Sequence, residues 1–322
     1  MTLDTSIPTT IPQTAAQISP LHRAYWRKHP TALVRDTLGL SFWEMQSQIL
    51  RDLQRYRRVA VRSCNGSGKT YAAAAAVIWW LMTWDNALAI TTAPTNHQVR
   101  DLLWREIRRI HRNNAALIGG TLNQMSLDIS DRNYAIGIST DAPERFQGFH
   151  EGNILFVVDE ASGVDEEIYE AIEGCMTSKR ARLLLIGNPT RRSGTFYEAF
   201  HGERSLWHQV HISALDTPNL VAGEVLIDGL VTGKWVEEAG RKWGEKSPTY
   251  QIRVLGDFPS QSIDTTFGID TAEAAVQQAS TPDNFGFRLW RADSSESKTT
   301  HPFPVPDSRA FSRLFSTRLG FR

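Results

Sequence analysis

The chain has 322 residues, of which 41% are hydrophobic and 22% are charged, so it can bury one large core or two modest ones. Its 35 basic and 35 acidic side chains cancel, which excludes a protein that binds nucleic acid through overall positive charge. Two cysteines, Cys64 and Cys175, are too few for a disulfide framework. The polar N-terminal residues lack the layout of a signal peptide. The longest apolar stretch, residues 71–84, is shorter than the ~20 residues of a membrane span. We therefore expect a soluble intracellular protein without membrane contact.

Short aliphatic runs alternate with helical patterns from residue 21 onward. In residues 95–111, apolar side chains recur on one helical face, and Thr95 with Gln98 predicts a capping box at the start of that helix. Strands that alternate with helices predict an α/β fold with a mostly parallel sheet flanked by helices. The predicted buried strands are residues 59–62, 88–92, 134–139, 154–158 and 183–186.

The two ends of the chain differ from this central part. Residues 1–20 are polar and rich in proline and threonine, which predicts a flexible arm before a domain of residues 21–215. Residues 216–279 look mainly helical and connective, with Asp270 as the N-cap of a helix. Residues 280–322 are polar and proline-rich at first and basic at the end, which predicts a disordered tail.

The stretch VRSCNGSGKT joins a predicted strand to a long alanine-rich helix. Backbone N–H groups of such a loop, with the helix N-terminus behind them, form a cradle for phosphate oxygens. Gly66 and Gly68 let the backbone approach closely. Lys69 reaches the β- and γ-phosphates, and the Thr70 hydroxyl ligates Mg²⁺. Ser63 stands where the usual pattern has glycine, but serine is small enough for the turn. Unless the match is an accident on a surface loop, it predicts an ATP site built from Ser63, Cys64, Asn65, Gly66, Ser67, Gly68, Lys69 and Thr70.

A second candidate site follows the aliphatic run ILFVV, where Asp159 and Glu160 stand at the carboxyl end of a predicted buried strand. Open α/β sheets bind ligands at that end. Asp159 would hold Mg²⁺ through water, and Glu160 would orient and deprotonate the attacking water. The alternative is a solvated acidic turn, which the phosphate loop upstream makes the weaker interpretation.

Three other side chains are candidates from their positions alone. Asn188 ends the strand in LLLIGN, where it could sense the γ-phosphate or the water, or form an ordinary Asn-Pro turn. Gln46 lies upstream of the phosphate loop, where an amide could read adenine. Arg145 lies on a loop before the strand of Asp159 and could act as an arginine finger. A solvated charge is the alternative for Arg145, and Arg62 competes for the finger role.

A resemblance to a known family rests on an ordered run of motifs: FWEMQ, VRSCNGSGKT, ITTAPTNHQVRDLLWREI, RFQGFH, ILFVVDEASGV and LLLIGNPTRRSGTFYEAF. This run resembles the ATPase domain of the tailed-phage terminase large subunit over about residues 40–215. The resemblance implies a P-loop NTPase of the ASCE, RecA-like class that uses ATP and Mg²⁺. It also implies an adenine motif at Gln46, a phosphate loop at Ser63 to Thr70, a metal-binding and catalytic pair at Asp159 and Glu160, and a coupling motif at residues 187–189.

The same resemblance implies partners and a setting. Family members package double-stranded DNA into a procapsid as a ring at the portal protein, fed by a small terminase subunit. A member would be encoded by a phage or prophage and would act in the cytoplasm of the bacterial host. The family commonly places an arginine where Asn65 stands here. Residues 250–277 resemble the linker that leads into the family's nuclease domain, and because only a tail follows, we expect no nuclease activity.

Two alternatives come from other classes of protein. A helicase-like DNA-dependent ATPase would need a second α/β lobe after residue 215, where too little periodic sequence is present. A nucleotide-binding protein without turnover would have no use for a base at Glu160. Against these two alternatives, the family resemblance implies an ATP-hydrolysing motor subunit for DNA packaging.

Overall fold

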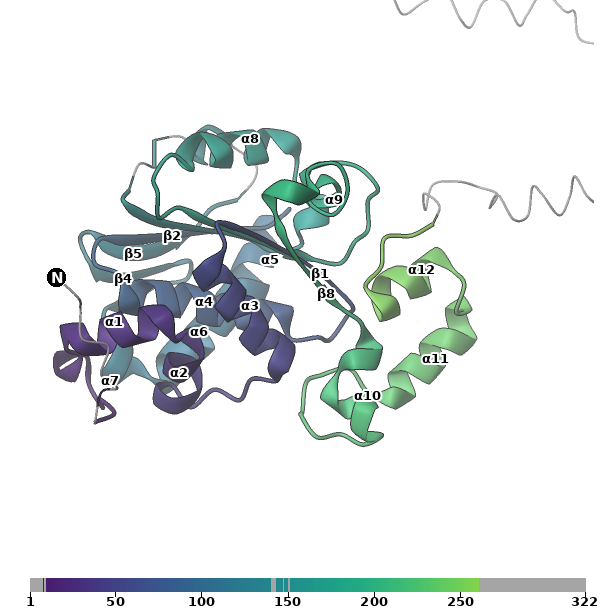
Figure 1. Cartoon of the computed structure of the whole chain (residues 1–322), viewed down its shortest axis with the longest axis horizontal. Helices are drawn as coiled ribbons and strands as arrows, with labels where there is room; N and C mark the ends of the chain where they lie inside the picture. Colours follow the sequence, from purple (N-terminus) through teal and green to yellow (C-terminus); the bar gives the residue numbers. More distant parts are fainter. Residues whose placement is uncertain (1–7, 9, 140–142, 147, 150, 261–322) are drawn as a thin grey trace, which may run out of the picture. The chain divides into compact units, whose positions relative to one another are not determined.

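An eight-stranded sheet with helices on both faces forms the centre of the protein (Figure 1). The structure is a computed structural model that describes residues 8, 10–139, 143–146, 148, 149 and 151–260. The predicted cap at Asp270 and the predicted tail of residues 280–322 lie outside the described residues.

The sheet has the strand order β3-β4-β5-β2-β6-β7-β1-β8. The six strands from β5 to β8 in this order are parallel neighbours, whereas β3 and β4 pair antiparallel. The strands are β1 (Arg58–Ser63), β2 (Ala87–Thr92), β3 (Thr121–Leu122), β4 (Ser126–Ser130), β5 (Asn133–Gly137), β6 (Asn153–Val158), β7 (Arg182–Gly187) and β8 (His208–Ile212).

The predicted mostly parallel α/β sheet is confirmed. The five predicted strands correspond to β1, β2, β5, β6 and β7, with their ends displaced by one or two residues. The sequence prediction missed β3, β4 and β8. These three lie at or next to the sheet edges, and they are not continuous apolar runs because only part of their side chains is buried.

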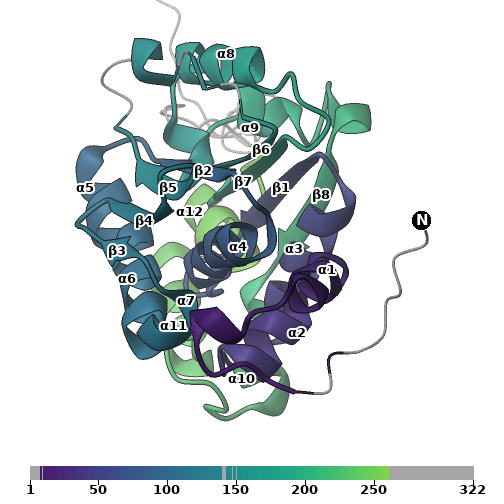
Figure 2. The same cartoon turned by 90° about the vertical axis from the view of Figure 1, so that its left-hand side faces the viewer.

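Helices cover both faces of this sheet (Figure 2). Two separate clusters of buried apolar side chains fill the space between the helices and the sheet. One face carries α8 (Glu166–Cys175) and α9 (Thr195–Glu198). The other face is covered by α1 (Pro20–Lys28), α2 (Pro30–Ala32), α3 (Glu44–Arg55), α4 (Lys69–Thr83), α6 (Trp104–Asn113) and α7 (Ala115–Ile118).

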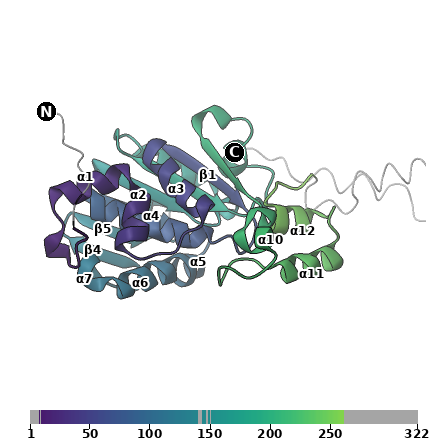
Figure 3. The ribbon, with the colours of Figure 1, turned by 60° about the horizontal axis from the view of Figure 1, so that its bottom comes forward.

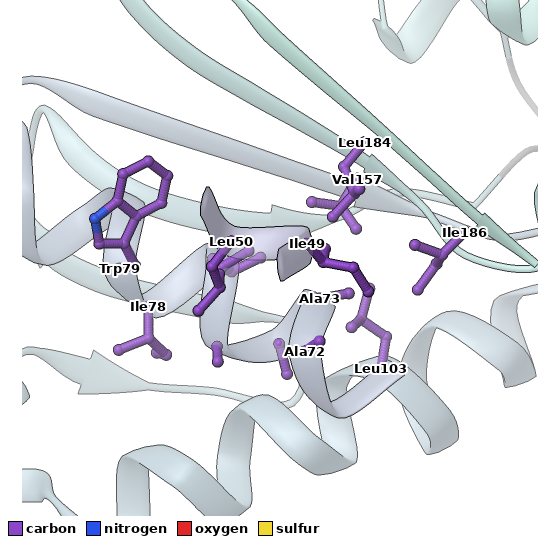
Figure 4. Packing of buried hydrophobic residues seen from close by; sticks show 14 of the residues in the cluster. Ile49, Leu50, Ala72, Ala73, Ile78, Trp79, Leu103, Val157, Leu184 and Ile186 are labelled. Atoms are coloured by element: carbon purple, nitrogen blue, oxygen red, sulfur yellow. The ribbon is translucent and has the colours of Figure 1, made fainter. Parts of the chain in front are cut away.

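Helix α4 is buried along nearly its whole length. Residues 72–76 are all alanines with 0% exposure, and Figure 4 shows Ala72 and Ala73 in one cluster with Val157, Leu184 and Ile186 of the sheet. Because alanine has the smallest side chain after glycine, the helix can lie close to the strands while α3 and α6 pack on its other sides. The alanine run therefore positions the helix that begins at Lys69.

The predicted helix over residues 95–111 is interrupted. A short α5 (Asn96–Gln98) leads into a π-helical segment, Val99–Leu103, before α6 begins at Trp104. The predicted capping box is half formed. The Thr95 hydroxyl accepts from the Gln98 N–H at 3.2 Å, but the Gln98 side chain contacts that hydroxyl instead of the Thr95 backbone.

After β8 the chain forms short helices, α10 (Pro218–Ala222), α11 (Gly233–Trp243) and α12 (Pro248–Tyr250) (Figure 3). Three backbone hydrogen bonds tie this region and β8 to the loop after β1: Cys64 N to Ile212 O, Asn65 N to Arg253 O, and Val231 N to Gly66 O. The domain boundary at residue 215 stays a prediction, but residues beyond it contact the phosphate loop directly. None of the helices in the described ranges is long and apolar enough to cross a membrane.

Enlarging one alanine of α4 should destabilise the fold. Ala74→Leu adds three carbons where exposure is 0%, and overpacking of a dense core costs about 1–3 kcal/mol. We expect a melting temperature lower by roughly 2–12 °C, measured by calorimetry. The control is Ala116→Leu, at an exposed position of α7. Equal melting temperatures for the two variants would contradict the tight packing of α4.

Candidate active site

The loop between β1 and α4 has the strand–loop–helix form that the sequence predicted. β1 ends at Ser63 and α4 begins at Lys69, and Gly66 and Gly68 have φ angles of 66° and 78°. Only glycine enters this left-handed region without strain. The hydroxyls of Ser63 and Ser67 lie 2.7 Å apart across the loop, so the serine in the usual glycine position closes the turn with a hydrogen bond.

The predicted loop residues do not all face a ligand. The N–H groups of Cys64 and Asn65 donate to carbonyls of β8 and of residue 253. The Cys64 side chain has 0% exposure, and burial raises the pKa of its thiol to about 12. Phosphate binding by this loop stays a prediction, and within it the N–H groups of Cys64 and Asn65 are already bound to protein carbonyls.

Lys69 points toward two of the other predicted residues. Its Nζ donates to Asn188 Oδ1 at 3.2 Å and lies 3.9 Å from Glu160 Oε1. The Asn188 amide in turn donates to the Ser63 carbonyl at 2.6 Å. Asn188 thus links the end of β1 to the lysine of the phosphate loop, instead of forming only a turn.

Thr70 and Asp159 form the second contact across the site. The Thr70 hydroxyl donates to Asp159 Oδ2 at 3.2 Å, and the Glu160 N–H donates to Asp159 Oδ1 at 2.9 Å. Asp159 is 1% exposed. Burial, with a smaller effect of the Glu160 charge, raises the pKa of Asp159 to about 7.

The backbone at Glu160 is specialised. Its φ of 50° is left-handed, one of two such values among the non-glycine residues that the structure describes. Gly187 packs against it so closely that a Cβ there would lie 2.9 Å from the Ala161 nitrogen. Residues in this region cost about 1–3 kcal/mol and cluster at functional sites. Glu160 stays partly exposed, with 30% of its side-chain surface accessible, so water can reach its carboxylate.

The residues around Asp159 fit a magnesium ion. Thr70 and Asp159 supply hard oxygen atoms, and Mg²⁺ takes one or two carboxylates and completes its shell with phosphate oxygens and water. No group of three or more His, Cys, Asp or Glu side chains within the described part of the chain forms a metal cage.

A cleft of about 900 Å³ opens from the phosphate loop. Besides the loop and Gln46, it is lined by Tyr71, by α6 and by residues 227–230. The Arg109 guanidinium lies 4.7 Å from the centre of the Tyr71 ring. The sequence prediction missed these lining residues, because α6 is separated from the loop by β2 and residues 227–230 lie in a stretch without a recognisable motif.

Gln46 is brought to the phosphate loop, but its amide bonds to protein backbone. Its Nε2 donates to the Gly68 carbonyl at 3.0 Å, and its Oε1 accepts from the Trp43 N–H at 3.2 Å. Adenine reading by Gln46 stays a prediction.

Arg145 lies on a short 3-10 helix, Pro143–Phe146, ahead of β6 in the chain. The Phe146 carbonyl accepts from Cys175 at the C-terminal end of α8, at 3.0 Å. The arginine-finger role of Arg145 stays a prediction.

Arg62 is the alternative candidate for the arginine finger, and its side chain contacts residues outside the phosphate loop. Its guanidinium pairs with Asp257 and lies 5.6 Å from the ring centre of Phe200. These contacts hold it in a separate cavity of about 660 Å³ beside β8.

Comparison with known proteins supports the family resemblance. The probable terminase large subunit of Enterobacteria phage P7 is 26% identical over 257 residues, which cover 73% of this chain and 49% of that protein. The chain is a homologue of the terminase large subunit. It spans about half the length of this relative, and no family model matches it.

Solved structures show the same fold as this terminase homologue. The large terminase ATPase domain of Thermus phage P74-26 gives a TM-score of 0.55 at 18% identity, covering 70% of this chain and 96% of that domain. The large terminase of a thermophilic bacteriophage in complex with ADP gives 0.52 at 15% identity, covering 68% of this chain and 54% of that one. The predicted P-loop α/β fold is confirmed.

The raised pKa of Asp159 predicts how the stability of this terminase homologue depends on pH. An unfolded aspartate has a pKa near 3.9, so the folded protein keeps a proton on Asp159 that the unfolded chain releases. Stability from this group is present below about pH 4 and is lost as pH rises to about 7, by at most about 1.4 kcal/mol per pH unit.

The measurement is the melting temperature in EDTA, without nucleotide, between about pH 5 and about pH 7.5. We expect it to fall more steeply with pH in the wild type than in Asp159→Asn, whose amide does not titrate. Asp131→Asn, in an exposed turn, should keep the wild-type slope. Parallel curves for wild type and Asp159→Asn would contradict the raised pKa.

Proposed function

We propose that this chain is the ATP-hydrolysing motor subunit of a DNA-packaging terminase, which translocates double-stranded DNA into a procapsid. The observation that carries the proposal is the convergence of Lys69, Thr70, Asp159, Glu160 and Asn188 at one edge of the sheet. Homology to the P7 protein supports the same role.

Each residue has a distinct part in the proposed reaction. Backbone N–H groups of the loop and the Lys69 ammonium bind the phosphates. Glu160, which water can reach, accepts a proton from the attacking water. The oxygen of that water bonds to the γ-phosphorus while the bond between the γ-phosphorus and ADP breaks. Thr70 and Asp159 would hold Mg²⁺, which neutralises charge on the phosphates when bound. Asn188 holds the Lys69 ammonium beside Glu160.

The proposed partners follow from the same homology. They are double-stranded DNA, a small terminase subunit, the portal protein and further copies of this chain in a ring, in the cytoplasm of the host bacterium. The first test is the ATPase rate of the purified chain with and without double-stranded DNA. Stimulation by DNA supports the motor role, and hydrolysis in neither condition contradicts it. After β8, the described residues up to 260 add helices and no strand, so a second helicase-like lobe is absent from that range.

Substitutions of Lys69 and Glu160 should impair ATP hydrolysis in different ways. Lys69→Ala removes a phosphate contact, so nucleotide affinity and turnover should both fall. Glu160→Gln keeps the size of the side chain but removes the base, so turnover should fall by about 10²–10⁴ while ATP still binds. Calorimetric binding and single-turnover hydrolysis separate the two effects.

The matched controls are Lys234→Ala on the exposed side of α11 and Glu167→Gln on the exposed side of α8. Both should behave like the wild type. Wild-type hydrolysis by Glu160→Gln would show that another group is the base.

Arg145 should act on the site of a neighbouring subunit if it is the arginine finger. Arg145→Ala alone should lower the ATPase rate by about 10³ or more. Mixed with Glu160→Gln subunits, it should regain activity, because each subunit can complete a site with the other.

The control for this mixing experiment is Arg132→Ala, an exposed arginine outside the loop, which should need no rescue. If no mixing ratio restores activity, Arg145 is not a finger supplied in trans.

A further inference from the structure

Two loops bring side chains of the candidate active site together at the carboxyl edge of the sheet. The loop after β6 carries Glu160, and the loop after β7 carries Asn188. The Lys69 ammonium lies 3.9 Å from the Glu160 carboxylate and donates to Asn188 at 3.2 Å. Because both contacts hold only while the two loops keep their relative position, the groups that join the loops control the geometry of the site.

Ser162 joins these two loops. It follows Glu160 by two residues, in a short 3-10 helix, and it is only 7% exposed. Its hydroxyl oxygen accepts from the Arg191 N–H at 2.9 Å and from the Thr190 N–H at 3.1 Å. A serine hydroxyl has two acceptor lone pairs, so the two N–H groups of the loop after β7 use its full accepting capacity.

We infer that Ser162 is a positioning residue of the ATPase site, which acts by fixing the backbone next to Asn188. The Thr190 N–H that Ser162 accepts also donates to the Asn188 carbonyl at 2.9 Å. Only Pro189 stands between Asn188 and Thr190, and a proline ring fixes φ near −65°. The backbone that carries the Asn188 side chain therefore has little freedom to move while Ser162 holds it. The inference rests on the proposed function and adds a residue to the same site.

Other contacts join the same two loops on either side of Ser162. A Cβ on Gly187 would lie 2.9 Å from the Ala161 nitrogen, so the loops touch where they leave the sheet. Further along, the Glu166 carboxylate accepts from the Thr195 N–H at 2.8 Å and from the Thr195 hydroxyl at 2.6 Å. Glu166 is exposed whereas Ser162 is buried, and a hydrogen bond away from water is electrostatically stronger. The serine is therefore the firmer of the two polar links.

Movement of Asn188 would disturb two contacts at once. Its amide donates to the Ser63 carbonyl at 2.6 Å, and its Oδ1 accepts from Lys69. A misplacement of about 1 Å in a catalytic site can cost about 10²-fold in rate. In the proposed site the phosphates are held by Lys69 and by the loop after β1, to which Ser162 does not belong. Loss of the Ser162 hydroxyl should therefore slow hydrolysis more than it weakens ATP binding.

The test measures single-turnover ATP hydrolysis and ATPγS affinity of the full chain with Mg²⁺, in the wild type, Ser162→Ala, Asn188→Ala and the double variant. We expect Ser162→Ala to hydrolyse ATP about 10- to 100-fold more slowly, with an ATPγS affinity within about twofold of the wild type. Because Ser162 acts through Asn188, the double variant should be at most about threefold slower than the slower single variant. The control is Ser205→Ala, at an exposed position before β8, which should match the wild type.

Hydrogen exchange at the Thr190 and Arg191 N–H groups gives a second measurement that needs no turnover. Removal of their acceptor in Ser162→Ala should speed exchange at both positions. If Ser162→Ala does not fold, Ser162→Cys replaces it, since a thiol is similar in size and its sulfur is a weak acceptor. That variant should also hydrolyse ATP slowly.

Four results would overturn the inference: unchanged exchange at both N–H groups, a wild-type rate of hydrolysis in the Ser162 variant, a double variant whose loss is the product of the two single losses, or an affinity that falls as much as the rate. The last result would mark a general structural role for Ser162. Each of them, found beside an active wild type, leaves the proposed function standing. A wild type that hydrolyses no ATP would instead contradict the proposed function itself.

Discussion

The parallel alignment of β6, β7 and β1 is the constraint on which the site depends. β7 pairs with both neighbours, so three strands deliver their carboxyl ends, and the loops that follow them, to one edge. Asn188 from the middle strand can then bond both to Lys69 and to the end of β1. Reversal of any one of these strands would move the loop that follows it to the opposite edge of the sheet.

Two ionisable side chains of this site are buried, and their burial costs free energy of folding. Asp159 is 1% exposed and Lys69 is 7% exposed, and removing two charges from water is repaid only when partners are close. Here the two hydrogen-bond partners of Asp159, the Glu160 N–H and the Thr70 hydroxyl, are neutral, and burial raises the pKa of the carboxyl. A buried carboxyl whose hydrogen-bond partners are neutral is stabilised in its charged form by a nearby cation, which supports the proposed binding of a metal–nucleotide complex.

Sequence patterns predicted the parts of the molecule whose neighbours are close along the chain. The strand, loop and helix around Gly66 and Gly68 are contiguous, and the apolar runs before Asp159 and Asn188 mark strands that are buried on both faces. The π-helical turn at residues 99–103 and the half-exposed strand β8 carry no comparable signal. Only the order of the strands in the sheet shows that Asn188 lies beside both Lys69 and the end of β1.

The hydrogen bond between the Gln46 side chain and the Gly68 carbonyl could not be predicted from the sequence, because its acceptor is a backbone atom. A carbonyl is present at every position, so a side chain that binds Gly68 O needs no particular residue there and leaves no pattern in the sequence. The one trace is the glycine itself, and glycine is also what a phosphate loop needs for its φ angles. Gly68 thus meets two requirements. It lets the loop open toward a phosphate, and it leaves room on the other side for the Gln46 amide. Only the packing around Gly68 shows that both requirements apply.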